Sequence, residues 1–119
     1  IKKKNLKFLI LQKFLDNNEK KFFSLFKNVS LPDSLDKSFL FQDTFDIVSS
    51  LKFLITIDTA IGHIAGYLGK KNYLLLQHPS VFYWGFEKKK SVDYKNHIII
   101  RQSQRGDWGS VIKELIKLL

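Results

Sequence analysis

The sequence predicts an α/β protein with a Rossmann-like arrangement, in which a mostly parallel sheet is covered by helices on both faces. Two observations lead to this prediction. Short apolar runs of strand length alternate along the chain with segments whose apolar residues recur at helical spacing. The strand-length runs are continuously apolar, which is typical of parallel strands that are buried on both faces.

The first part of the chain predicts a strand, a helix and a short extended segment. The apolar run LKFLILQ at 6–12 has the length of a strand. Asp16 and Glu19 are spaced as in a capping box, so we expect a helix from there to about Lys27. NVSLP at 28–32 predicts an extended segment that its proline ends, and the polar DSLDKS that follows is typical of a turn.

The middle of the chain predicts a helix, a strand and a second helix. FQDTFDIVSSL at 41–51 has helical spacing, with Asp43 as its cap, and KFLITID at 52–58 is a strong strand pattern. Over 60–68, apolar residues recur at i, i+3, i+4 and i+7, as in a helix that lies on a sheet, and we expect Gly69 to end it. The residues of this stripe are Ile61, Ile64, Ala65 and Leu68.

The last part of the chain predicts two further strands and a closing helix. The strands are NYLLLQ at 72–77 and HIIIR at 97–101. The aromatic-rich connection 77–96 is longer than usual, so we expect it to be a lid or a binding loop. GDWGSVIKELIKLL predicts an amphipathic helix capped by Asp107. Its expected apolar face comprises Trp108, Val111, Ile112, Leu115 and Leu119.

The composition fits one globular domain spanning residues 1–119. Domains are usually about 100 to 150 residues long, and a hydrophobic content of 45% supplies a core. The lack of cysteine excludes disulfides and a thiolate nucleophile.

No apolar run approaches the ~20 residues that span a bilayer, so we expect no transmembrane segment and a location in the cytoplasm or at the inner face of the membrane. Because the chain starts at Ile1 and contains no Met, we also expect it to be part of a longer protein.

The formal net charge of +9 suits an anionic ligand and raises the question of nucleic-acid binding. Nearly all of the positive charge comes from lysine, whereas nucleic-acid recognition favours the forked guanidinium of arginine, which occurs only at Arg101 and Arg105. We therefore expect solvated lysine-rich faces and no specific nucleic-acid partner. A lysine-rich polyanion-binding protein stays open as the less favoured alternative.

The stretch FLITIDTAIGHIAGYLGKK passes directly from a strand pattern to a helix pattern, with Asp58, Thr59 and His63 near the junction. Ligands of such folds bind at the carboxyl ends of the strands, where this junction is expected to lie. The first turn of a helix presents free N–H groups that suit phosphate, and His63 falls on the same helix face as Thr59. Helix capping by Asp58 and Thr59, with His63 at an exposed surface position, is the other interpretation that the pattern leaves open.

DTAIGHIAGYLGK also resembles the D-[ST]-x-x-x-H-x-A-x-x-L-G-[KR] signature in the C-terminal half of GT-B glycosyltransferases. The resemblance is to the family 9 heptosyltransferases and to bacterial tetratricopeptide-repeat proteins similar to O-linked N-acetylglucosamine transferase. Three further blocks are similar to this group in the same order, and the weakest part lies at 16–38. These blocks are FLILQK, FQDTFDIVSSLKFLITIDT and RQSQRGDWGSVIKELIKLL.

The resemblance implies one half of a GT-B fold that binds a nucleotide-diphosphate sugar as substrate, with no further cofactor. The other lobe of such enzymes usually supplies the general base, so no catalytic residue is assigned here and enzymatic activity stays open. It also implies an N-terminal lobe or a tetratricopeptide-repeat partner, and an acceptor that is a glycan, a lipid or a protein. The residues implied for the donor diphosphate and sugar are Asp58, Thr59, Ala60, His63, Lys13 and Gln12.

The aromatic-rich loop departs from the family, because the arginine that the family places between aromatic residues is missing near Tyr83 and Trp84. Ser80, Tyr83 and Trp84 are candidate contacts for the base or the sugar, although clustered aromatic residues near a sheet also commonly form core. His78 and His97 have no carboxylate at metal spacing, so we predict no metal site. A non-catalytic α/β module that binds a nucleotide or phosphate at the same helix is the alternative function.

Overall fold

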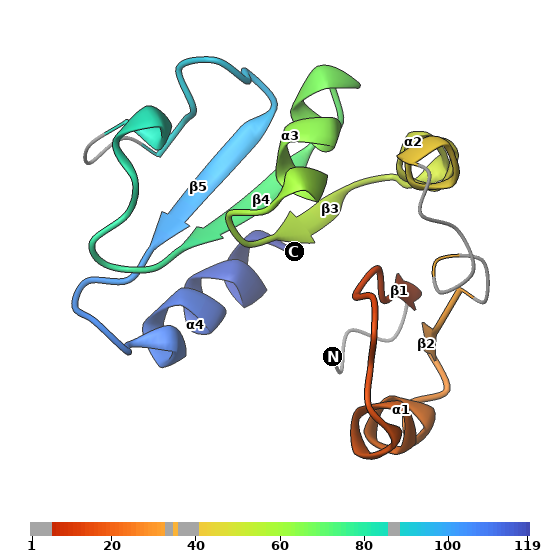
Figure 1. Ribbon diagram of the computed structural model, residues 1–119. Helices are drawn as coiled ribbons and strands as arrows, with labels where there is room; N and C mark the ends of the chain where they lie inside the picture. The colour runs from red at the N-terminus through yellow and green to blue at the C-terminus, as the bar shows by residue number, and fades with distance from the viewer. Residues whose placement is uncertain (1–5, 33–34, 36–40, 86–88) are drawn as a thin grey trace. The chain divides into compact units, whose positions relative to one another are not determined.

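The computed structural model in Figure 1 is an α/β fold in which the strands pair in parallel and helices flank the sheets, so the predicted Rossmann-like class is confirmed. Two compact units make up the chain, Ile1–Thr44 and Phe45–Leu119, and each is described by itself. One domain over 1–119 stays a prediction. The residues that the structure describes are 6–32, 35, 41–85 and 89–119.

The first unit contains a two-stranded parallel sheet and one helix. β1 (Phe8–Leu9) pairs with β2 (Val29–Ser30), and α1 (Asn17–Ser24) connects them. The capping box is confirmed, since the backbone N–H of Glu19 donates to Asp16 Oδ1 at 2.7 Å and that of Asp16 donates to Glu19 Oε2 at 2.9 Å. These two bonds satisfy donors that a helix start otherwise leaves unpaired.

Both N-terminal elements are shorter than predicted. The strand expected over 6–12 has only two paired residues because its partner is equally short. α1 ends three residues before Lys27, since the N–H of Leu25 turns back to the carbonyl of Phe22 in a tighter final turn. The turn expected for DSLDKS lies, apart from Leu35, outside the described residues.

The helix expected over 41–51 is present as α2 (Phe41–Ser50), with Val48 fully buried. The prediction that Asp43 caps it is wrong. The helix already includes Phe41, so Asp43 lies within the first turn. A carboxylate there still interacts favourably with the positive end of the helix dipole, which explains why an acidic residue suits the position.

The second unit is built on a three-stranded parallel sheet in the order β3-β4-β5. β3 (Leu54–Thr56) and β5 (His97–Arg101) lie on either side of β4 (Asn72–Leu76), which is buried along its whole length. The three predicted strands are thus confirmed, although β3 is shorter than 52–58. The pairs that align toward the carboxyl ends are Thr56 with Leu74 and Leu76 with Arg101.

Helices cover both faces of this sheet (Figure 1), as expected for parallel strands. α4 (Trp108–Leu118) packs on one face through Val111 and Leu115. α3 (Ala60–Tyr67) lies on the other, where a side chain at Gly62 would meet Leu74. The core on the α4 face comprises Tyr73, Leu75, Ile100, Val111 and Leu115, and that on the opposite face comprises Leu74, Leu76, Trp84 and Ile99.

The stripe predicted for α3 is confirmed, because Ile64 and Ala65 are buried and Ile61 and Leu68 are half-buried. The helix ends one residue earlier than expected, and Gly69 follows with φ of 65°, a left-handed conformation that glycine adopts without a Cβ penalty.

The predicted face of α4 is only partly correct. Asp107 caps the helix by accepting the Ser110 N–H at 3.1 Å, as expected. Val111 is buried, whereas Trp108 and Ile112 remain 40% and 43% exposed. The sheet covers the face of the helix that carries Val111, and the side chains of Trp108 and Ile112 lie at the edges of that face.

Gly66 in α3 lies against the ring of Tyr94, and a Cβ added there would lie 2.4 Å from ring carbons. We expect Gly66→Ala to lower the free energy of unfolding by roughly 1 to 2 kcal/mol, because overpacking outweighs the gain in helix propensity. Urea denaturation measures this change. Gly109→Ala in α4 is the matched control, since its Cβ would lie 3.7 Å from the nearest atom, Asp107 Oδ1. A control variant that is destabilised as much as Gly66→Ala would contradict the packing argument.

Candidate functional site

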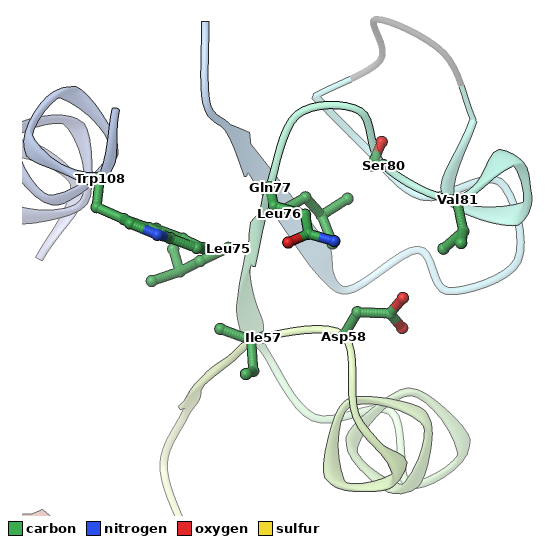
Figure 2. A pocket seen from close by; sticks show the side chains of 8 residues that line it. All are labelled: Ile57, Asp58, Leu75, Leu76, Gln77, Ser80, Val81 and Trp108. Carbon is green, nitrogen blue, oxygen red and sulfur yellow. The ribbon is translucent and has the colours of Figure 1, made fainter. Parts of the chain in front are cut away.

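A pocket of about 250 Å³ opens at the carboxyl edge of the second unit's sheet (Figure 2). Its walls come from the residues that follow β3, from the end of β4, from the loop after β4 and from the first residue of α4. Ligands of parallel α/β sheets bind at this edge. The lining residues are Ile57, Asp58, Leu75, Leu76, Gln77, Ser80, Val81 and Trp108.

Asp58 holds the aromatic loop in place. Its carboxylate accepts hydrogen bonds from the hydroxyl of Tyr83, at 2.9 and 3.0 Å to its two oxygens, and from the indole N–H of Trp84 at 2.9 Å. Tyr83 and Trp84 belong to a short 3₁₀ helix, η2 (Phe82–Trp84). The hydrogen bond to Asp58 is the main cause that raises the pKa of Tyr83, and burial and the Asp58 charge act in the same direction.

Trp84 is 1% exposed and lies between two histidines. Its ring stacks on His63 at a centroid distance of 4.9 Å and lies parallel to His97 at 5.9 Å. The indole is therefore packed among imidazole rings inside the protein. The sequence left open whether the clustered aromatic residues contact a ligand or form core, and Trp84 lies in the core. Its polar contribution to the site is the hydrogen bond that its indole N–H donates to Asp58.

His63 is half-buried, although the pattern predicts it opposite the apolar stripe of α3. The loop after β4 explains the difference, because Trp84 and Tyr94 cover that side of the helix. His63 Nδ1 lies 3.2 Å from the Tyr94 hydroxyl. Within the part of the chain that the structure describes, no hydrogen bond to His63 Nε2 is found. His63 is not among the residues that line the pocket.

The first turn of α3 begins directly after Asp58. Thr59 occupies the N-cap position, as predicted, yet its hydroxyl lies 3.5 Å from the Ile57 carbonyl and makes no capping hydrogen bond. Thr59 and Ala60 are both exposed. No side chain caps this turn, and the Gly62 N–H donates to the Thr59 carbonyl at 3.0 Å. The N–H groups that remain available to water or to an anion are those of Ala60 and Ile61.

Arg101, at the end of β5, holds the loop from the opposite side. Its guanidinium donates to the Ser80 hydroxyl oxygen and to the backbone carbonyls of Trp84, at 2.9 Å, and Gly85. Because Ser80 accepts from Arg101, its own hydrogen remains for donation to a ligand in the pocket that it lines.

At the start of β4, a fully buried amide lies between the side chains of the two neighbouring strands. Asn72 on β4 donates to the Thr56 hydroxyl on β3 at 2.9 Å and lies 3.1 Å from His97 Nε2 on β5. His97 Nε2 also lies 3.0 Å from the Gly62 carbonyl in α3, so this nitrogen either donates to Gly62 or accepts from the Asn72 amide, according to its tautomer. Burial is the main cause that lowers the pKa of His97, so its neutral form is favoured.

The structure therefore brings together the candidates Asp58, Ser80, Tyr83, Trp84 and His63, and places Thr59 and Ala60 at the start of the adjoining helix. Gln12 and Lys13 belong to the first unit, just after β1, where the Gln12 side-chain amide donates to the Lys13 carbonyl at 3.4 Å. Their predicted approach to the phosphates stays a prediction.

The sequence pattern does not indicate that Trp108 and Gln77 line the pocket, since it predicts Trp108 only as part of a core face and Gln77 only as a strand end. Topology could have indicated this, because the residues that follow parallel strands share one edge of the sheet.

Among the described residues, no group of three or more His, Asp or Glu side chains is placed to hold a metal ion. Over the same residues, no helix combines the length and the apolar character that crossing a membrane requires.

No protein-family model, curated protein or solved structure matches the chain significantly. The fold and the site thus define an α/β protein with a small pocket at the carboxyl edge of a parallel sheet.

Proposed function

We propose that this chain is the donor-binding part of a GT-B glycosyltransferase and holds a nucleotide-diphosphate sugar at the carboxyl edge of its second unit. The observation that carries the proposal is the coincidence of two features at Asp58. Asp58 lines the pocket, and the first turn of α3, which no side chain caps, begins after it. A pocket beside free helix N–H groups suits a ligand that combines an organic moiety with phosphate.

Each polar group near the pocket has a role in this proposal. The Thr59 hydroxyl and the N–H groups of Ala60 and Ile61 hold the diphosphate and stabilise the charge that develops as it leaves. Ser80 donates its hydroxyl hydrogen, and His63 presents Nε2 one helical turn after Thr59. Asp58 contributes indirectly, since its carboxylate bonds Tyr83 and Trp84 and so fixes the loop that borders the ligand.

The resemblance of DTAIGHIAGYLGK to the glycosyltransferase signature supports the same assignment. An N-terminal lobe or a tetratricopeptide-repeat partner would supply the general base and the acceptor site, with a glycan, lipid or protein as acceptor. A cytoplasmic location, at the inner face of the membrane for a lipid acceptor, accords with a nucleotide-sugar donor.

The test is nucleotide binding by this chain, measured by thermal shift and calorimetry with UDP, ADP, GDP and CDP. We expect one of them to raise the melting temperature, because a ligand at 100 times its Kd adds about 2.7 kcal/mol to the free energy of unfolding. Thr59→Ala and His63→Ala should each weaken that binding by roughly three- to tenfold, the range for loss of one hydrogen bond.

His78→Ala is the matched control, because His78 is exposed and does not line the pocket. It should bind as the unchanged protein does. Failure of all four diphosphates to stabilise the protein at millimolar concentration would overturn the proposal. Transfer of a sugar by the protein together with an N-terminal lobe distinguishes a donor-binding part from a non-catalytic nucleotide-binding module.

A further inference from the structure

The pocket has an apolar end and a polar end. Figure 2 shows the side chains of Trp108, Leu75 and Ile57 together on one side and the polar side chains of Asp58 and Ser80, with Val81, on the other; Gln77 and Leu76 lie between the two groups. The polar end adjoins the first turn of α3. A ligand that spans the pocket would therefore place its charged part near α3 and its apolar part near Trp108.

The size of the pocket limits what the apolar end accepts. Pockets that enclose drug-sized ligands measure about 300 to 1,000 Å³, and this one measures about 250 Å³. It can hold one compact part of a nucleotide sugar, not the whole molecule. The aliphatic side chains of its wall favour a planar, weakly hydrated group over phosphate or sugar.

Trp108 lies outside the hydrophobic core and is partly exposed. It is 40% exposed and does not belong to the buried cluster that α4 forms with the sheet. The first turn of α4 is nevertheless well fixed, because Asp107 accepts the Ser110 N–H and also the Ser103 hydroxyl at 3.0 Å. Hydrogen bonds from the side chain and the backbone of Ser110, and from the Ser103 side chain, lower the pKa of Asp107. The helix start therefore positions an indole at the wall of the pocket.

The other aromatic candidates for stacking are already engaged. Trp84 is buried and stacks with His63 and His97, and the Tyr83 hydroxyl donates to Asp58. Neither Trp84 nor Tyr83 lines the pocket. Among the side chains that line the pocket, the aromatic one is Trp108.

The geometry points to Trp108 as the residue on which the base of the donor stacks, with Gln77 reading the edge of that base. This assignment rests on the proposed function and identifies its base subsite. The amide of Gln77 both donates and accepts hydrogen bonds, as the edge of a heterocyclic base requires. Stacking on an aromatic side chain contributes enough to binding that its removal is readily measured.

The experiment compares Trp108→Ala, Trp108→Phe and the control Ile112→Ala. Ile112 lies one turn further along α4 with a similar exposure of 43%, and it does not line the pocket. The probes are inorganic pyrophosphate and whichever of UDP, ADP, GDP and CDP stabilises the unchanged protein most. We expect Trp108→Ala to weaken binding of the nucleoside diphosphate about tenfold or more and to leave pyrophosphate binding unchanged. Trp108→Phe retains a ring and should lose less.

Fluorescence gives a second readout, because the sequence contains two tryptophans and Trp84 is buried. Nucleotide binding should quench the emission of the unchanged protein, and the quenching should disappear in Trp108→Phe while a thermal shift persists. Tight nucleotide binding by Trp108→Ala, or an equal loss in Ile112→Ala, would overturn the base subsite and leave the proposed function standing. Absence of nucleotide binding by the unchanged protein would overturn both.

Discussion

Replacement of Asn72 by alanine is expected to lower the free energy of unfolding by about 3 kcal/mol. Asn72 is 0% exposed and connects Thr56 on β3 with His97 on β5 from its place on β4. Its removal leaves the buried Thr56 hydroxyl without its amide partner, and each such group costs about 1 to 3 kcal/mol. The missing amide also leaves a cavity in a strand that is buried on both faces.

Chemical denaturation of three variants measures this network. Thr56→Val removes the partner hydroxyl, and the double variant Thr56→Val with Asn72→Ala should be more stable than the sum of the single changes predicts, because the two residues interact directly. Asn96→Ala is the control, since Asn96 is exposed and, within the described residues, its side-chain amide donates only to the Gly69 carbonyl, so the change should cost about 1 kcal/mol or less. A loss below 1 kcal/mol for Asn72→Ala would show that the buried network contributes little to stability.

Replacement of Asp58 by alanine is expected to lower the free energy of unfolding by about 2 kcal/mol and to release the loop beside the pocket. The change removes the acceptor of the Tyr83 hydroxyl and of the Trp84 N–H. Trp84 is buried, so its N–H loses its acceptor without gaining full access to water, which costs about 1 to 3 kcal/mol. The loop should then open more often, and proteolysis or hydrogen exchange within 80–85 should increase.

The pKa of Tyr83 gives an independent check of the same contact. The Asp58 carboxylate raises that pKa, so Asp58→Ala should shift one tyrosine titration toward its usual range, as followed by phenolate absorbance. Asp93→Ala is a suitable control, because Asp93 is exposed and lies in a loop outside the pocket. A Tyr83 titration that Asp58→Ala leaves in place would contradict the contact.

The fold class and most of the elements could be predicted from the sequence because their signals are local. Continuous apolar runs gave the three strands of the second unit, and the stripe through Ile64 gave the buried face of α3. Helix starts follow from the sequence only in part. Asp16 and Asp107 cap as predicted, whereas Asp43 lies inside its helix, since an acidic residue is favourable both at a cap and in the first turn.

The candidate site could be predicted only in part, because its contacts join residues that are distant in the sequence. The pattern identifies Asp58 and Thr59 at the end of a strand. It does not indicate that Asp58 accepts hydrogen bonds from residues 25 and 26 positions later, or that Arg101 contacts the same loop. Helical periodicity assigned Trp108 to the core, since periodicity does not show where the sheet ends.

The way in which Arg101 holds the loop has an evolutionary consequence. Two of its hydrogen bonds are to the main-chain carbonyls of Trp84 and Gly85, which every amino acid carries. Neighbouring positions such as Val81 and Phe82 can therefore mutate while the path of the loop is preserved. Descendants of one ancestral sequence could diversify in what they accept at this edge of the sheet, with selection acting on side chains while the loop keeps its anchor.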